Sequence, residues 1–138
     1  TYLSVFDNIR VVNAEEDYNL YCDCNKENEN RKSLSLFYVN LMKENVFDID
    51  KIFRIILILI NKVETNMEEE NNKDTVDEVV NNLLVFISNT FEEMKSHKDF
   101  NLIEKHILKI SNAKKSDYKS LTSKIKFKYM DLLELLED

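Results

Sequence analysis

Residues 120–138 read SLTSKIKFKYMDLLELLED, and their apolar side chains have the spacing of an amphipathic helix. These side chains recur at steps of three and four residues and are therefore predicted to share one buried face: Ile125, Tyr129, Met130, Leu133 and Leu136. Thr122 and Ser123 precede them where a helix prefers a hydroxyl at its N-cap, because such an oxygen accepts bonds from unpaired amide groups. The stretch is predicted to be a capped amphipathic helix.

The whole chain of 138 residues contains no glycine and no proline. Sheet proteins use these residues in tight turns, so their absence favours an all-α fold of helices joined by polar loops. The absence of glycine also excludes the glycine-rich loops that hold phosphate in nucleotide-binding proteins. Hydrophobic residues make up 43% of the sequence, which is enough for residues 1–138 to bury one core as a single domain.

Helical spacing recurs in the rest of the chain. We expect helices at residues 2–21 (with a break near Asn13), 33–43, 50–63, 74–96 and from Asp99 to about Ile110. Asp74, with Asp77 three residues later, resembles a capping box. The helix at 50–63 is apolar nearly all round and should be the most buried, although a buried strand at 55–60 is an alternative interpretation.

Polar segments separate these helices and are predicted to be loops or linkers: residues 25–32, 64–74 and 111–120. The pattern amounts to two helices in about forty residues, the period of HEAT-type solenoids. We therefore expect antiparallel helix pairs stacked as a HEAT-type solenoid, with a compact bundle as the alternative architecture.

The sequence does not describe an enzyme. His97 and His106 lack a histidine or cysteine three or four residues away, so neither a metal site nor a bound cofactor is expected. Serines such as Ser88, Ser111 and Ser123 have no histidine nearby in sequence and no glycine for a nucleophile elbow. The frequent acidic pairs are typical of a solvated surface. We expect a non-catalytic interaction domain.

Cysteine usage and hydropathy bear on location. Cys22 and Cys24 are one residue apart and cannot bridge each other without strain, so reduced thiols of an intracellular protein are expected. The longest apolar run, at 55–60, has six residues and is far shorter than a membrane span. We expect a monomeric cytoplasmic protein that does not enter a membrane.

Charge is unevenly distributed along the chain, whose formal net charge is −7. Residues 64–78 hold seven acids against one lysine, and residues 109–128 hold seven lysines against one acid. These are either solvated surfaces or two patches of opposite sign that steer a charged partner. Aromatic residues within the basic run also suit stacking on RNA, although the acidic total disfavours nucleic acid.

Three stretches carry a family resemblance. Residues 122–135, TSKIKFKYMDLLEL, resemble the closing signature of the MIF4G domain, the middle domain of the translation initiation scaffold eIF4G. Upstream, 37–43 (FYVNLMK) looks like a helix of that family, and 74–94 looks like its long helix that ends near a phenylalanine and a methionine. The likeness spans about 34–135. Lys124 departs from the pattern, because the family usually has arginine there.

This resemblance implies the C-terminal repeats of a larger HEAT-type domain, with the earlier repeats outside this stretch. It also implies a non-catalytic scaffold that binds a DEAD-box RNA helicase of the eIF4A type, with RNA as a further partner through a local basic patch. Family position and local charge assign the candidate partner contacts as Lys114, Lys115, Lys124, Lys126, Lys128 and Asp131.

Two alternatives remain open. A related domain of an mRNA decay, splicing or cap-binding factor would keep the fold and change the pathway. An unrelated helical bundle would instead grip an amphipathic peptide in one apolar groove.

Overall fold

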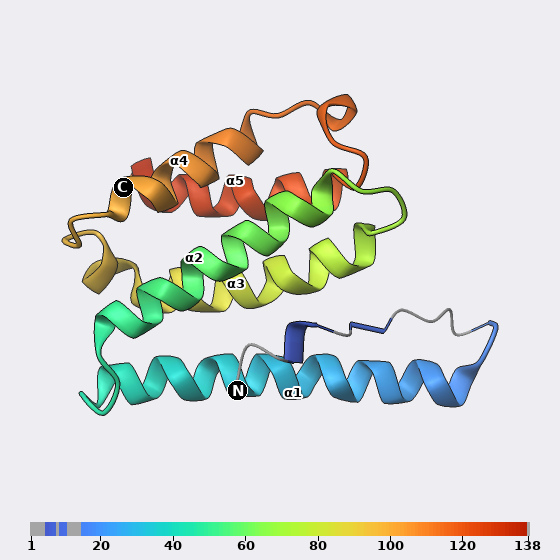
Figure 1. Ribbon diagram of the computed structural model, residues 1–138, viewed down its shortest axis with the longest axis horizontal. Helices are drawn as coiled ribbons and strands as arrows, with labels where there is room; N and C mark the ends of the chain where they lie inside the picture. The colour runs from blue at the N-terminus through green and yellow to red at the C-terminus, as the bar shows by residue number, and fades with distance from the viewer. Residues whose placement is uncertain (1–4, 8, 11–14, 138) are drawn as a thin grey trace.

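The computed structural model describes residues 5–7, 9–10 and 15–137, and this part of the chain is helical with no strand. The all-α prediction is thereby confirmed. The elements in chain order are α1 (Tyr18–Lys43), α2 (Ile49–Met67), α3 (Lys73–Met94), α4 (Phe100–Ser111), a short 3-10 turn at Lys115–Asp117 and α5 (Ser123–Glu137) (Figure 1).

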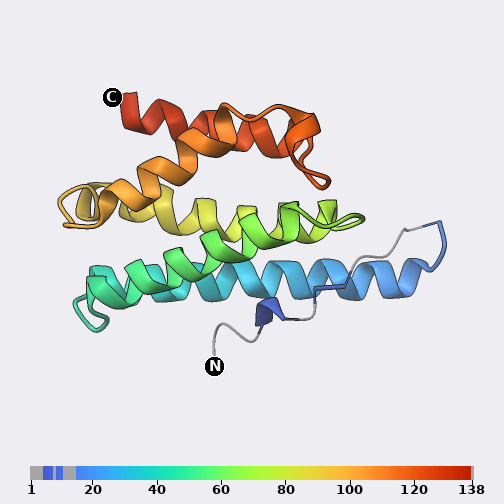
Figure 2. The same cartoon turned by 45° about the horizontal axis from the view of Figure 1, so that its top comes forward.

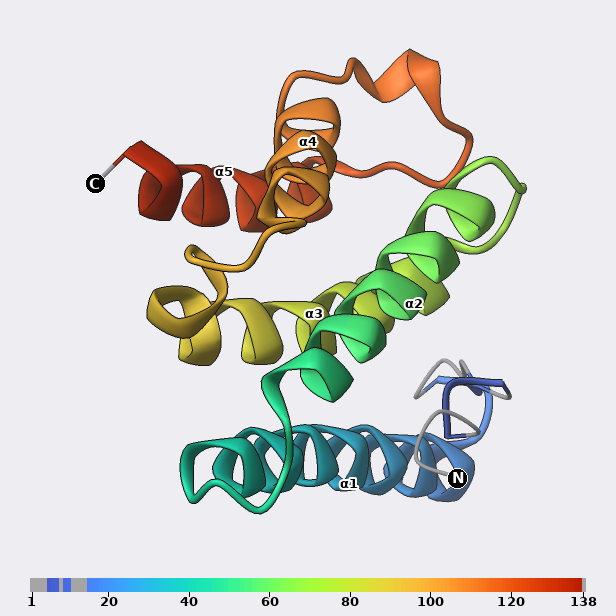
Figure 3. The same ribbon diagram turned by 60° about the vertical axis from the view of Figure 1, so that its left-hand side comes forward.

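Consecutive helices run in opposite directions, so the chain folds back and forth (Figures 1 and 2). The connections 68–72 and 112–122 lie at one end of the molecule, and the connections 44–48 and 95–99 lie at the other. Helix α3 contacts α1, α2 and α5, while α4 packs against α5. Figure 3 shows α3 between α1 on one side and the α4–α5 pair on the other. Helix α3 is therefore the centre of the fold.

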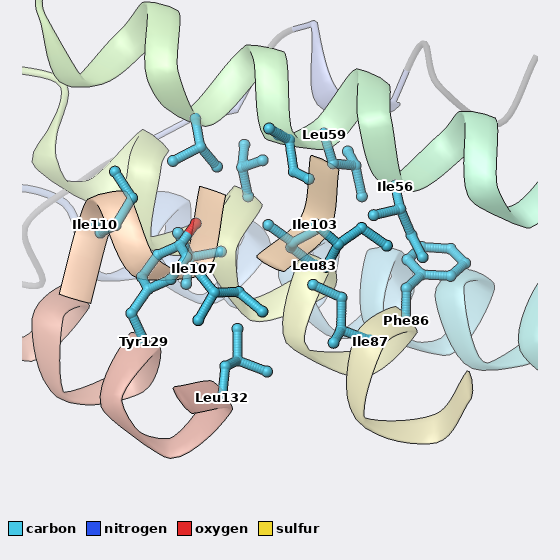
Figure 4. Close-up of a cluster of buried hydrophobic side chains, with 14 of the residues drawn as sticks. Ile56, Leu59, Leu83, Phe86, Ile87, Ile103, Ile107, Ile110, Tyr129 and Leu132 are labelled. Carbon is cyan, nitrogen blue, oxygen red and sulfur yellow. The ribbon is translucent and has the colours of Figure 1, made fainter. Parts of the chain in front are cut away.

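Helices α2 to α5 supply most of one continuous apolar core (Figure 4), to which α1 adds Val39 and Met42. Leu83 and Phe86 of α3 are fully buried and meet Ile56 and Leu59 of α2. On the other side of α3 the core continues through Ile103, Ile107, Ile110, Tyr129 and Leu132, which come from α4 and α5. Burial of branched aliphatic side chains at helical spacing supplies the main stabilisation of these elements.

The predicted loop at 25–32 is wrong, because these residues lie inside α1. The buried face of α1 is polar there. Arg31 is only 4% exposed and donates to the backbone oxygen of Val5 and to the carboxylate of Glu78, at 2.8 and 3.1 Å. One turn later, the Ser35 hydroxyl lies 2.7 Å from the Asn82 side-chain oxygen. A search for apolar periodicity cannot detect a helix that docks through hydrogen bonds.

Of the helix predicted at 2–21, residues 18–21 are α-helical and begin α1, whereas the described residues before them form no α-helix. Residues 15 and 16 form a turn, and the Asp17 carboxylate caps α1 by accepting from the Leu20 amide at 3.0 Å. The rest of that prediction falls largely on residues 1–4, 8 and 11–14, which lie outside the described part of the chain.

The central helices are longer or shifted relative to prediction. Residues 55–60 are helical and not a strand, and α2 continues through Glu64 to Met67, so the linker shrinks to 68–72. The predicted capping box is absent, because Asn72 precedes α3 and Asp77 points its carboxylate to lysines of α5. Asn45 and Asn71 adopt positive φ angles of 61° and 63°, the conformation for which other proteins commonly use glycine.

Ser120 ties two connections together at one end of the molecule. Its amide donates to the Met67 backbone oxygen at 2.9 Å, and its hydroxyl donates to the Glu69 backbone oxygen. The same hydroxyl accepts from the Asn72 amide at 3.1 Å. Ser120 is completely buried, and its three bonds satisfy backbone groups of both connections.

His97 makes the corresponding junction at the other end. Its ring stacks on Phe53 of α2 with 4.0 Å between ring centroids, and its Nε2 lies 2.8 Å from the Asp50 carboxylate. Its Nδ1 accepts from the Asp99 amide at 3.1 Å. The 95–99 connection is thereby fixed to the start of α2.

Replacement of Ser120 by alanine should lower the free energy of unfolding by about 1–3 kcal/mol, because the Asn72 amide and the Glu69 carbonyl each lose a hydrogen bond worth about 0.5–1.5 kcal/mol. Urea denaturation followed by circular dichroism measures this loss. The control is Ser116→Ala, which removes the same hydroxyl from an exposed position in the same connection. Equal effects of the two substitutions would contradict a specific role for Ser120.

Candidate interaction surface

The six candidate contact residues occupy two elements. Lys114 and Lys115 lie in the connection between α4 and α5, and both are exposed. The Asp117 carboxylate accepts from the Lys114 amide at 2.8 Å and holds this connection in its 3-10 turn. The other four candidates, Lys124, Lys126, Lys128 and Asp131, are on α5. The predicted cap of α5 is confirmed, since the Thr122 hydroxyl accepts from the Ile125 amide at 3.2 Å.

Lys124 and Lys128 face α3 and share one carboxylate. Lys124 Nζ lies 3.3 Å from Asp77 Oδ2, and Lys128 Nζ contacts Asp77 Oδ1 and donates to Asn81 at 2.6 Å. The Lys128 side chain is only 20% exposed. An ion pair that is partly shielded and supported by a second hydrogen bond is worth more than an open surface pair. Lys128 therefore holds α5 against α3.

Lys126 lies on the opposite flank of α5, because two residues correspond to more than half a helical turn. It is half-buried, and no acidic side chain lies within 4.0 Å of its amino group in the described residues. The three lysines of α5 consequently do not form one patch. The sequence analysis placed all three lysines off the buried face, and the structure adds that Asp77 lies on the flank of Lys124 and Lys128.

Phe127, Met130 and Asp131 form the outer face of α5. Phe127 is 63% exposed, and Met130, which was predicted to be buried, is also exposed. The buried face instead consists of Ile125, Tyr129 and Leu132. An exposed phenylalanine beside a methionine is costly in water and typical of a contact site. We call Phe127, Met130 and Asp131, with the adjacent Lys126, the α5 outer face.

The acidic and basic segments lie along each other instead of forming two separate patches. Ion pairs join Glu64 to Lys109, Glu70 to Lys119 at 4.0 Å, and Asp77 to Lys124 and Lys128. No salt bridge involves Lys114, Lys115 or Lys126 among the described residues, so these three are the lysines of the segment that keep a surplus of positive charge. Partners more than forty residues apart in sequence could not be matched by inspection of charge runs.

A buried polar network lies between α2, α4 and α5. His106 is buried, its Nε2 lies 2.6 Å from the Tyr129 hydroxyl and its Nδ1 lies 3.2 Å from the Glu64 carboxylate. A carboxylate only accepts, so we assign the proton to Nδ1 and let Nε2 accept from Tyr129. With this assignment each of the two bonds has one donor and one acceptor.

The network shifts two pKa values. The hydrogen bond from His106 lowers the pKa of Glu64 from 4.5 to about 2, with a further contribution from Lys109. Burial raises the pKa of Tyr129 well above its ordinary value. The carboxylate therefore stays ionised and the phenol stays neutral over the physiological range. Because its members come from α2, α4 and α5, the network joins these three helices.

The described residues hold no cluster of three or more histidine, cysteine, aspartate or glutamate side chains placed to bind a metal ion. Within the same part of the chain, no helix has the combination of length and apolar character that crossing a membrane demands. Comparison with models of known protein families, with curated proteins and with solved structures found no match for this chain.

The Glu64 network predicts a specific acid sensitivity. The folded-state pKa of Glu64 is depressed, so the stability that it contributes is present above about pH 4.5 and is lost as the pH falls toward 2. Glu64→Gln should therefore be less stable than the parent at pH 7, and the difference should narrow toward pH 2. Melting temperatures measured by circular dichroism from pH 7 to pH 2 test this.

Glu134→Gln is the matched control, because Glu134 is exposed on α5 and joins no ion pair in the described residues. Its stability should follow that of the parent over the same pH range. A difference in melting temperature between the parent and Glu64→Gln that stays constant from pH 7 to pH 2 would show that these contacts do not lower the pKa of Glu64.

Proposed function

We propose that this chain forms the C-terminal repeats of a MIF4G-like, HEAT-type scaffold and binds a DEAD-box RNA helicase of the eIF4A type without catalysing a reaction itself. In this proposal the α5 outer face contacts one lobe of the helicase. The proposal joins the sequence resemblance at residues 122–135 to the way in which these residues divide between core and surface.

The order of helix contacts supports a stacked arrangement. Helices α1, α3 and α5 follow one another through the contacts of α1 with α3 and of α3 with α5. Helix α2 packs on α1 and α3, and α4 packs on α5. Alternate helices thus contact each other in one row, with the intervening helices beside them, as in solenoids of helix pairs.

The exposure of Phe127 is the observation that carries the proposal. The closing signature contains more apolar residues than α5 needs for packing: Ile125, Tyr129 and Leu132 are buried, whereas Phe127 and Met130 face water. An aromatic side chain that contributes little to the core is a suitable anchor for a protein partner. Lys126 and Asp131 next to it supply charges of both signs that fix orientation.

The candidate residues then divide into two roles. Lys126 and Asp131, together with the exposed Lys114 and Lys115, are proposed to contact the partner directly. Lys124 and Lys128 are proposed to position α5 through Asp77. RNA remains a second candidate partner of the surplus positive charge at Lys114 and Lys115. A role in mRNA decay or splicing would keep the same surface and change the helicase that it selects.

Phe127→Ala should leave the free energy of unfolding within about 0.5 kcal/mol of the parent. The same substitution should weaken binding of a purified eIF4A-type helicase about tenfold or more, which corresponds to roughly 1.4 kcal/mol. Isothermal titration calorimetry and urea denaturation measure the two quantities. The matched control is Phe37→Ala on α1, which removes an exposed phenylalanine from a distant helix.

Charge reversal separates contact from positioning. Lys126→Glu should weaken helicase binding and leave stability nearly unchanged, because its amino group has no acidic partner in the described residues. Lys128→Glu should destabilise the fold itself, since it places a carboxylate against Asp77. If the parent does not bind the helicase, or if Phe127→Ala and Lys126→Glu bind as well as the parent, the proposal is wrong.

A further inference from the structure

A groove between α2 and α4 lies on a different part of the molecule from the α5 outer face. In Figure 1 these two helices lie in front of their neighbours α3 and α5. The groove has a volume of about 340 Å³, and its apolar lining comes from Leu57 and Ile60 of α2 and Leu102 of α4. We call it the α2–α4 groove.

Large aliphatic side chains near this groove are exposed to water. Leu102 within the groove is 43% exposed, and Ile58, next to Leu57, is 40% exposed. Apolar surface arranged along two neighbouring helices is unfavourable in water unless another apolar surface covers it.

The charges around the groove are predominantly positive. Lys105 and Lys109 line it. Arg54 is outside the lining, exposed on α2 three residues before Leu57. The only acid in the lining, Glu64, is already engaged by Lys109 and His106. No acidic side chain lies within 4.0 Å of Arg54 or Lys105 among the described residues. This surplus stands out in a chain whose net charge is −7.

The shape and lining favour a helix over a nucleic acid. Helix α4 has 12 residues and is about 18 Å long, which matches a partner helix of about three turns. Single-stranded nucleic acid usually stacks its bases on aromatic side chains, whereas this lining is aliphatic. His106 is the one aromatic ring in the lining, and it is buried and bonded to Tyr129.

We propose that the α2–α4 groove binds an acidic amphipathic helix of a partner protein. The apolar side chains of that helix pack on Leu57, Ile60 and Leu102, and its acidic side chains pair with Lys105 and Arg54. The inference does not depend on the helicase proposal, because none of these residues belongs to the α5 outer face.

A displayed library of 14-residue helical peptides, with randomised apolar and charged positions, tests the proposal. Selection on the intact chain should enrich peptides that carry leucine or isoleucine at three- and four-residue steps and glutamate or aspartate elsewhere. Fluorescence anisotropy with the enriched peptide should then show affinity that decreases as salt increases, since part of the attraction is electrostatic.

Two groove variants, each with a control, assign the site. Leu102→Asp should lower the affinity for the enriched peptide at least tenfold. Leu36→Asp, at a similarly exposed leucine of α1, should leave that affinity unchanged. Lys105→Glu should lower the same affinity several-fold. Lys26→Glu, at an exposed lysine of α1, should leave it unchanged. Circular dichroism of each variant verifies that the fold is retained.

Two results of the selection would overturn the proposal: no peptide is enriched, or the enriched peptides are basic or polar. Two results of the binding measurements would also overturn it: the peptide binds Leu102→Asp as tightly as the parent, or it binds Lys105→Glu as tightly as the parent. Self-association of the chain that Leu102→Asp abolishes and the enriched peptide does not displace would assign the groove to a second copy. Binding of oligouridine that the groove variants weaken and the peptide does not displace would assign it to RNA. Each of these last two outcomes also rejects a helical protein partner.

Discussion

The fold depends on the burial of α3, which packs against α1, α2 and α5 at once. Each side of α3 uses a different interaction. Leu83 and Phe86 make apolar contacts with the core, and Glu78 binds Arg31 of α1. Asp77 binds two lysines of α5. Because apolar packing is non-directional and hydrogen-bonded ion pairs are directional, the core holds the helices together while the polar contacts set their register.

The sequence was sufficient to predict a helix where the buried side chains are apolar and helically spaced. It was insufficient where the buried side chains are polar. Helices α2, α4 and α5 were predicted close to their observed positions because isoleucine and leucine recur at helical steps and Thr122 caps α5. The first half of α1 was missed because its inner face is polar around Arg31. In the candidate surface, the distinction between Lys126 and Lys128 depends on Asp77, 51 residues before Lys128, and requires the three-dimensional structure.

The molecule presents two proposed contact surfaces built from separate side chains. The α5 outer face exposes one aromatic ring among charges of both signs, and the α2–α4 groove exposes aliphatic side chains among positive charges. Surfaces of such different chemistry select different partners. A chain that binds a partner at each of these proposed surfaces would hold two proteins at a fixed distance from each other.

The Ser120 and His97 junctions have a consequence for the cost of binding. They fasten the connections at both ends of the helices, one through backbone hydrogen bonds and the other through a stacked ring and a carboxylate. Helices α2, α3 and α4 are held at both ends and have little freedom to spread, so a ligand of the α2–α4 groove meets a preformed shape and immobilises few additional side chains. Binding then costs little conformational entropy, so the affinity depends mainly on how well the two surfaces fit. Association should need no slow rearrangement of the helices.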